Sequence, residues 1–127
     1  MLFRSLIAET KNGTSPAELI FVGPDDLVSE ALAKMSECGI TQIPVLEDNR
    51  SVGSLHESGI LAKLLADREL LNAKVSEVME KSFPVLDVDV SFAELKSKLQ
   101  RNRAVLIEDF KRITAIITRS DVLDIQG

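Results

Sequence analysis

Apolar and polar positions along this chain follow the same succession of periods twice. In the first half, an extended apolar stretch at residues 18–22 leads through a Gly-Pro-Asp turn into a helical pattern that Gly39 is placed to end. Two strand-like stretches, "QIPVLED" and "SVGSLHES", follow around a turn at Asn49 and Arg50, and a second helical pattern comes after them. The predicted inward faces of these helices comprise Val28, Ala31, Leu32 and Met35, and Ile60, Leu61, Leu64 and Leu65.

The second half repeats this order from "FPVLDVD" onward. A helical pattern with Phe92, Leu95 and Leu99 inward comes next, followed by the strand-like stretches "RAVLIED" and "ITAIITRS" around a turn near Phe110 and Lys111. A short final helix is predicted from Asp121. The repeat aligns Val28 with Phe92, Glu30 with Glu94, and His56 with Thr118. Each half is therefore predicted to be strand, helix, strand, strand, helix, which is an α+β arrangement.

The repeat divides the chain into four segments. Residues 1–17 are predicted to be a linker or leader, residues 18–66 the first unit, and residues 83–127 the second. Residues 67–82 are a charged connector with a short helix in "VSEVME", whose Val75, Val78 and Met79 are expected to pack back on the core. Units of about 50 residues bury too little surface alone, so the two should fold as one pseudo-symmetric pair.

Composition narrows the class of protein. The chain has 127 residues, 45% hydrophobic and 28% charged, which is typical of a globular protein. No apolar stretch approaches the roughly 20 residues of a membrane helix. The first residues lack the features of a secretory signal, so we expect a cytoplasmic protein. The single cysteine, Cys38, is near the end of an apolar helical pattern and is expected to be a small buried residue.

Charge and motifs argue against nucleic-acid binding and catalysis. The net charge is −5, the Lys and Arg residues are scattered, and Trp and Tyr are absent. Nucleic-acid binders instead cluster cations and use aromatic rings for stacking. The sequence contains no nucleophile elbow, no P-loop and no glycine-rich phosphate cradle. We therefore expect that the protein is not an enzyme and that it has no metal site.

Thr118 and Asp121 end the apolar run of the second half and allow two interpretations. They could form a capping box, in which Thr accepts the N3 backbone N–H and Asp accepts the N-cap N–H. Ser91 and Glu94 have the same spacing at the preceding helix. Alternatively, a carboxylate at the end of a strand could accept both hydroxyls of a vicinal diol, and the helix N-terminus would favour a nearby anion.

Several motifs in order resemble a known family. These are "PDDLVSEALAKMSECGITQIPVLED" and "VGSLHESGILAKLL" in the first half, and "KVSEVMEKSFPVLD" and "ITAIITRSDVLD" in the second. The chain resembles the tandem cystathionine β-synthase (CBS) domain pair, also called the Bateman module. Among its members, "GITQIPV", "GSLHES" and "VMEKSFPVLD" look most like the carboxyl-terminal regulatory region of cystathionine β-synthase.

The resemblance implies a fold, a ligand and a site. In the family, two βαββα units pack with pseudo-twofold symmetry, leave clefts that bind adenosine-containing ligands, and commonly dimerise. A hydrophobic strand followed by Thr or Ser, two residues and Asp takes the ribose. By position, the implied ligand-binding residues are Glu18, Leu19, Ile20, Ile40, Thr41, Gln42, Pro44, Ile116, Thr118, Arg119, Ser120 and Asp121.

The mirror-image cleft departs from this pattern. His56 stands where the motif has Thr, and Gly59 stands where it has Asp. We expect His56 to be structural, and we expect the helix after it to lack a cap. A lone His without other ligands at suitable spacing is a poor metal candidate.

Two functions remain open. The first is a non-catalytic regulatory module that binds S-adenosylmethionine or AMP and controls an attached or partner enzyme, with cystathionine β-synthase the implied host. ATP is disfavoured because its charge would meet an acidic chain in which the motif offers only Arg119. The second is a ligand-free homodimerisation or interaction module, favoured by the altered motif at His56 and Gly59. A nucleic-acid binder is a distant third.

Overall fold

The computed structural model describes residues 19–126 of the chain, and for residues 123–126 it describes the backbone alone. The predictions for residues 1–17 and for Glu18 therefore lie outside the described residues. The chain divides into two compact units, which are described separately. The N-terminal unit comprises Ile20–Ser82, and the described part of the C-terminal unit comprises Leu19 and residues 83–126.

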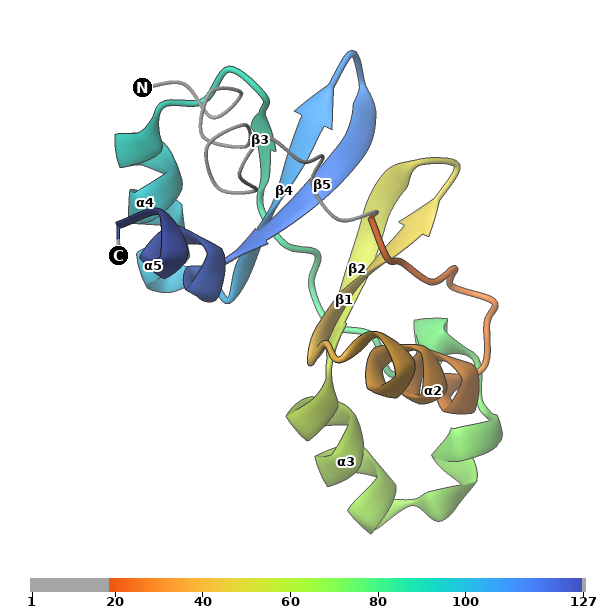
Figure 1. The fold of residues 1–127 in the computed structure, drawn as a ribbon. Helices are drawn as coiled ribbons and strands as arrows, with labels where there is room; N and C mark the ends of the chain where they lie inside the picture. The colour runs from red at the N-terminus through yellow and green to blue at the C-terminus, as the bar shows by residue number, and fades with distance from the viewer. Residues whose placement is uncertain (1–18, 127) are drawn as a thin grey trace. The chain divides into compact units, whose positions relative to one another are not determined.

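The N-terminal unit is a hairpin accompanied by helices (Figure 1). Its elements are α2 (Val28–Cys38), β1 (Gln42–Glu47), β2 (Arg50–His56), α3 (Glu57–Ala66) and the 3₁₀ helices η1 (Arg68–Asn72) and η2 (Val75–Glu77). Strands β1 and β2 are antiparallel. The stretch predicted at residues 18–22 contributes, among the residues described, a single parallel bridge from Val22 to Val45.

Helix α2 forms where the apolar period predicts it. The Leu27 N–H donates to the Glu30 carboxylate at 3.1 Å, which satisfies one of the free donors at the helix start. Gly39 ends the helix in the left-handed region, at φ 66°, and its N–H donates to carbonyls of the last turn. Val28, Ala31 and Met35 face the core and are fully buried. The predicted face and stop of this helix are confirmed.

The connector belongs to the N-terminal unit. Val75 and Val78 are buried in its core, and Met79 packs against that core, as predicted. Backbone bonds hold the segment in place, because Val28 N–H donates to the Ala73 carbonyl at 3.0 Å and Val75 N–H donates to the Asp26 carbonyl at 2.7 Å. After η2 the connector runs antiparallel to β2, pairing at Ser54 and Glu80.

The C-terminal unit repeats the hairpin with a fuller third strand (Figure 1). Its elements are β3 (Val85–Asp87), α4 (Phe92–Arg101), β4 (Ala104–Asp109), β5 (Arg112–Thr118) and α5 (Arg119–Gln126). Strand β3 is parallel to β4, and β4 is antiparallel to β5. Leu95 and Leu99 of α4 are buried against Val105 and Ile107 of β4, as the period predicts. The predicted α+β class is confirmed.

The two hairpins share irregular features. Each has a two-residue turn with both φ angles positive, at Asp48 and Asn49 (51° and 64°) and at Phe110 and Lys111 (52° and 66°), which is the type I′ geometry. The first turn is one residue earlier than predicted. Each ladder also shifts register at the corresponding place, after Val45 in β1 and after Ile107 in β4.

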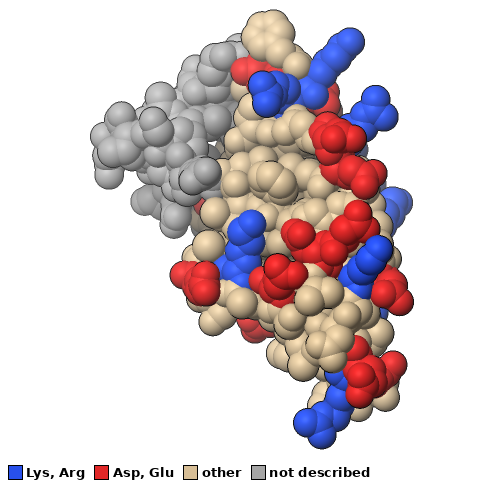
Figure 2. Space-filling model, turned by 90° about the vertical axis from the view of Figure 1, so that its right-hand side faces the viewer, with Lys and Arg blue, Asp and Glu red and all other residues tan. Residues whose placement is uncertain are grey.

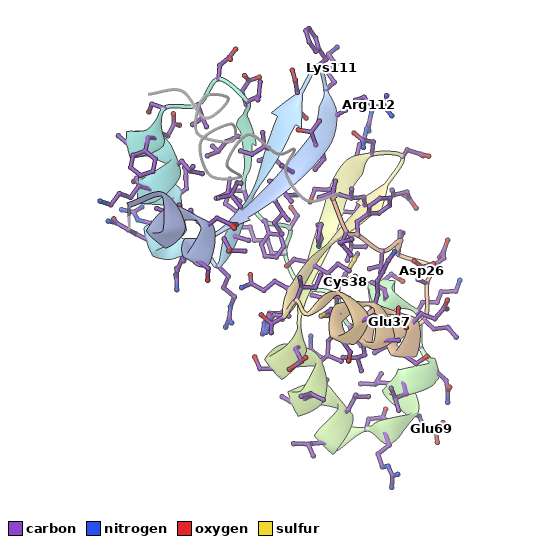
Figure 3. All side chains as sticks on the ribbon, viewed as in Figure 1. Asp26, Glu37, Cys38, Glu69, Lys111 and Arg112 are labelled. Atoms are coloured by element: carbon purple, nitrogen blue, oxygen red, sulfur yellow. The ribbon has the colours of Figure 1, made fainter. Side chains whose placement is uncertain are left out.

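Two burial predictions are wrong. On α3, Ile60 is buried and Leu64 packs on the core, but Leu61 and Leu65 are 48% and 90% exposed. A helix turns by about 100° per residue, so the residues that follow the inward pair lie on its flank. Cys38 is exposed because it is the last residue of α2, one turn beyond Met35, at the end of the core (Figure 3).

Candidate functional site at the end of β5

The site begins where β5 passes into α5. Thr118 is the last residue of β5 and pairs with Ala104 of β4, so the ladder fixes its backbone. Asp121 lies in the first turn of α5. Its Oδ2 accepts the Thr118 N–H at 2.8 Å and the Thr118 hydroxyl at 3.1 Å. Both groups are partly buried. The carboxylate is therefore held in one orientation at the end of the strand.

This arrangement differs from the cap at Ser91. There the Glu94 N–H donates to the Ser91 hydroxyl at 3.2 Å, as an N-cap hydroxyl ordinarily accepts. At Thr118 the hydroxyl donates to the carboxylate instead. Only the carboxylate half of the predicted capping box is therefore present. The reversed direction ties Thr118 to Asp121 rather than to the backbone of α5.

The Asp121 carboxylate uses only one of its two oxygens in these bonds. Both bonds from Thr118 end on Oδ2, and Oδ1 accepts no hydrogen bond from any residue that the structure describes. An ionised carboxylate has about four acceptor positions, so Asp121 can accept two further hydroxyl donors. A vicinal diol supplies two such donors on neighbouring carbons. The arrangement is chemically able to hold a ribose.

Arg119 and Ser120, between these two residues, have different surroundings. The Arg119 Nε–H donates to the Leu99 carbonyl at 2.7 Å, so the side chain caps the last turn of α4. Ser120 is exposed, and Ile116 is half-buried in β5. Of the implied ligand residues in the C-terminal unit, Thr118 and Asp121 are brought together, whereas the Nε of Arg119 is directed at α4.

The implied residues of the N-terminal unit are Ile20, Ile40 and Thr41, which precede β1, and Gln42 and Pro44, which lie in it. Ile20 and Ile40 are partly buried against that unit's core. Thr41 is exposed, and its carbonyl accepts the Glu57 N–H at 2.9 Å. Leu19, which belongs to the C-terminal unit, is half-buried, and Glu18 lies outside the described residues. The β1–β2 ladder pairs Gln42, the residue after Thr41, with His56.

Gln42 and Pro44 lie in β1, and they differ in whether a buried polar atom is left without a partner. The Gln42 Oε1 atom is buried and has no donor among the described residues, which is uncommon for a buried polar atom. Pro44 is fully buried, and its carbonyl accepts the Val22 N–H at 3.2 Å. This burial indicates that Pro44 packs in the strand, and its contact with a ligand stays a prediction.

His56 caps helix α3, contrary to the prediction that this helix lacks a cap. Its Nδ1 accepts the Gly59 N–H at 3.0 Å, and its Nε2 lies 2.6 Å from Oε2 of Glu80. The pairing with Glu80 was not predicted. Glu80 is distant in sequence and reaches His56 only because the connector pairs with β2. The sequence feature that could have indicated this contact is the pair of glycines Gly53 and Gly59, at which a Cβ would meet Met79 and Glu80 of the connector, respectively.

The distribution of charges and of metal-ligating side chains bears on which ligands the described residues could bind. On the face shown in Figure 2, the Lys and Arg side chains that the structure describes lie among Asp and Glu side chains and form no continuous basic patch. Among the side chains that the structure describes, those of residues 19–122, no three His, Cys, Asp or Glu gather as a metal site. No helix within residues 19–126 is long and apolar enough to span a bilayer.

Solved structures with this fold include several proteins that carry CBS domains. The CBS-domain containing protein ATU1752 from Agrobacterium tumefaciens aligns with a TM-score of 0.82 and 21% identity, over 100% of both chains. A CBS-domain containing protein from Bacillus anthracis aligns with a TM-score of 0.80 and 22% identity, over 99% of this chain and 92% of that one. These likenesses show the fold of a CBS domain pair.

Curated relatives are longer than this chain. The inosine-5′-monophosphate dehydrogenase of Methanocaldococcus jannaschii is 30% identical over 110 residues, which cover 84% of this chain and 21% of the relative. The uncharacterised protein MJ1232 of the same organism is 26% identical over 113 residues, which cover 85% of this chain and 36% of that protein. The chain thus spans about a fifth and about a third of these relatives.

The family model for the CBS domain matches this chain twice, at residues 15–66 and at residues 75–126. The two matches cover both units and most of the chain. They include the residues at the end of β5 and the residues at the start of β1. The chain belongs to the CBS domain family and carries two CBS domains in tandem.

Proposed function

We propose that this chain is a non-catalytic regulatory module that binds an adenosyl ligand through the junction of β5 and α5. The observation that carries the proposal is the one-sided use of the Asp121 carboxylate. Oδ2 accepts both bonds from Thr118, at 2.8 and 3.1 Å, and this fixes the group, while Oδ1 accepts no bond from the residues that the structure describes. The carboxylates of Glu30 and Glu77 also accept a backbone N–H at a helix start through one oxygen, and Asp121 differs from them by the second bond, from the Thr118 hydroxyl.

A second observation supports a ligand with N–H donors. The buried Gln42 Oε1 lacks a donor among the described residues, and such an atom costs free energy unless something satisfies it. The exocyclic amino group of adenine is a donor of this kind. The family resemblance places adenine beside Ile20, Ile40, Thr41 and Gln42, and we assign that role to them as part of the proposal.

The local charges favour some adenosyl ligands over others. Arg119 is the cation within the motif, and its Nε–H is engaged by the Leu99 carbonyl. A triphosphate would bring several negative charges to a chain with a net charge of −5. We therefore propose S-adenosylmethionine, which carries a cationic sulfonium, or AMP, which carries a single phosphate, and we rank ATP below both.

The module is proposed to control an enzyme by shifting a conformational equilibrium. A ligand can shift such an equilibrium only by its difference in affinity between the two states. The short motifs resemble cystathionine β-synthase, whereas the curated relative with a named activity is an inosine-5′-monophosphate dehydrogenase. The comparisons do not support the narrower resemblance, so the proposal names no host enzyme.

Calorimetric titration tests the proposal. S-adenosylmethionine, AMP and ATP would each be titrated into the wild-type chain, into Asp121→Ala and into Ser91→Ala. The Ser91 variant is the matched control, because it removes an ordinary helix cap of the same unit. Loss of either cap should cost about 1 kcal/mol of stability. Only the Asp121 variant should also lose binding.

The outcomes separate a ribose site from a cap. Saturable binding of S-adenosylmethionine or AMP that Asp121→Ala abolishes and Ser91→Ala retains would support the proposal. Binding that both variants retain would place the ligand elsewhere. If none of the three compounds binds, and both variants only melt earlier, then Asp121 is a cap and the proposal is wrong.

One observation favours a second function, a homodimerisation module. Leu61 and Leu65 on α3 are 48% and 90% exposed, and they lie one turn apart on the same flank. Burying two leucines at a self-association surface would be favourable by about 2 kcal/mol each. Light scattering of the wild type and of Leu61→Glu/Leu65→Glu tests this function. A dimer that the substitutions convert to a monomer supports it, and a wild-type monomer refutes it.

A further inference from the structure

The start of α3 in the N-terminal unit holds a carboxylate that its own sequence motif lacks. The Glu80 Oε2 atom, from the connector, lies 2.6 Å from Nε2 of His56. On the other side of the ring, Nδ1 accepts the Gly59 N–H at 3.0 Å. Because Nδ1 accepts a bond, the proton of the neutral ring is on Nε2, which donates to Glu80. The imidazole therefore bridges α3 and the connector.

Glu80 occupies the place that the repeat gives to an aspartate. Gly59 aligns with Asp121, since His56 aligns with Thr118. A Cβ at Gly59 would lie 2.9 Å from Oε2 of Glu80 and 2.5 Å from Cε1 of His56. Real Cβ atoms essentially never approach other atoms this closely, so an aspartate at 59 would displace the His56 ring and the Glu80 carboxylate from the positions in which they pair.

The donors at this junction are used internally as well. The Gly59 N–H is bound by His56, and the Glu57 N–H donates to the Thr41 carbonyl at 2.9 Å. In the C-terminal unit the corresponding hydroxyl and carboxylate bind each other through a single oxygen and leave Oδ1 available. In the N-terminal unit a larger imidazole ring fills the junction, and His56 is only 19% exposed.

We propose that the His56–Glu80 pair closes the junction of β2 and α3 to a ribose, so that each chain binds one adenosyl ligand and not two. This inference rests on the proposed function of the Thr118 and Asp121 junction. It adds that the altered motif of the N-terminal unit, His56 and Gly59, allows Glu80 of the connector to pair with His56 and block the place of a ribose. The closure determines the stoichiometry of the module.

The test opens the junction by giving it the pattern of the C-terminal unit. The variant His56→Thr/Gly59→Asp/Glu80→Ala would be prepared alone and together with Asp121→Ala. Both would be titrated with S-adenosylmethionine and with AMP, alongside the wild type and Asp121→Ala. We expect one ligand per wild-type chain, none with Asp121→Ala, two with the opened junction, and one with the opened junction combined with Asp121→Ala.

Other outcomes distinguish this inference from the proposed function. Two ligands per wild-type chain, or no gain in the folded opened variant, would overturn the closure. Binding by the opened variant with Asp121→Ala, when the wild type binds nothing, would support the closure and refute the proposed site at Asp121. Binding by none of the proteins would overturn both.

A wild-type measurement keeps the inference testable if the opened variant does not fold. His56 is the single histidine of the chain, so its ¹⁵N imidazole resonances need no further assignment. They should show the tautomer with the proton on Nε2, both in the free chain and when S-adenosylmethionine or AMP saturates it. The other tautomer, in the free or in the saturated chain, would overturn the closure.

Discussion

Replacing Gly53 with alanine should destabilise the N-terminal unit by wedging the connector away from β2. A Cβ at this position would lie 2.5 Å from Sδ and 2.9 Å from Cγ of Met79, and 3.1 Å from the carbonyl oxygen of Glu80. The corresponding residue of the C-terminal unit is Ala115, so the strand itself accepts a methyl group. The cost of Gly53→Ala therefore reports the packing of the connector.

The size of the effect follows from what can move. Met79 is flexible, but its sulfur would have to retreat by about 1 Å to reach an ordinary contact distance. The Glu80 carbonyl cannot retreat as freely, because it accepts the Ser54 N–H at 3.0 Å, and the Glu80 N–H donates to the Ser54 carbonyl at 2.8 Å. Overpacking of this kind costs about 1–3 kcal/mol, and we expect about 2 kcal/mol.

Urea denaturation followed by circular dichroism would measure the loss, with an unchanged slope. Amide hydrogen exchange at Ser54 and Glu80 should accelerate, because their shared bonds open first. Val52→Ala is the control, since the neighbouring Val52 is exposed and should change stability by less than about 0.5 kcal/mol.

A double-mutant cycle with Met79→Ala decides whether the reasoning is right. If the new methyl group collides with Met79, then truncating Met79 relieves part of the strain. The stability loss of the double variant should then be smaller than the sum of the two single losses by at least about 0.5 kcal/mol. A loss below about 0.5 kcal/mol for Gly53→Ala, or strictly additive costs, would refute the claim that Gly53 admits the connector.

Three further changes test local parts of the fold. Gly39→Ala should cost about 1 kcal/mol in urea denaturation, because φ is 66° and no atom lies within 4 Å of the added methyl, so an unchanged stability would contradict the backbone origin of the cost. Phe110→Asn should raise the urea midpoint and stabilise by about 1 kcal/mol, because Phe110 is 90% exposed at φ 52° and Asn tolerates this conformation; a loss would show that the ring makes stabilising contacts. Arg119→Ala should cost about 1 kcal/mol by removing the donor to the Leu99 carbonyl, and calorimetry should show nearly unchanged ligand affinity; a tenfold loss of affinity would return Arg119 to the ligand site.

The repeat in the apolar pattern predicted most of the fold. The period of 3.6 around Val28 and Leu95 and the stop at Gly39 depend on residues close in sequence, and the structure has them where predicted. The face of α3 was less predictable, because an unbroken apolar run in "ILAKLLA" fits more than one inward face. Tertiary packing chose Ile60 and Leu64 and left Leu65 exposed.

The site was predictable only in part. Thr118 and Asp121 are three residues apart at a strand end, so their proximity follows from local geometry. The direction of the hydroxyl bond did not follow, because a capping box uses the same two residues with Thr as the acceptor. The pairing of His56 with Glu80 depends on the connector lying against β2, and no local pattern reports such a contact.

The positions where the two hairpins differ have a common physical cause. Gly53 stands where the C-terminal unit has Ala115, and Gly59 stands where it has Asp121. In the N-terminal unit, a Cβ at Gly53 would collide with the Met79 side chain, and a Cβ at Gly59 would collide with the His56 ring and the Glu80 carboxylate. The altered motif there fits the connector, because Met79 and Glu80 occupy space that larger side chains at 53 and 59 would take. Loss of the aspartate at 59 is therefore coupled to gain of the His56–Glu80 bridge, and restoring Asp at 59 alone should destabilise the unit rather than recreate a ribose site.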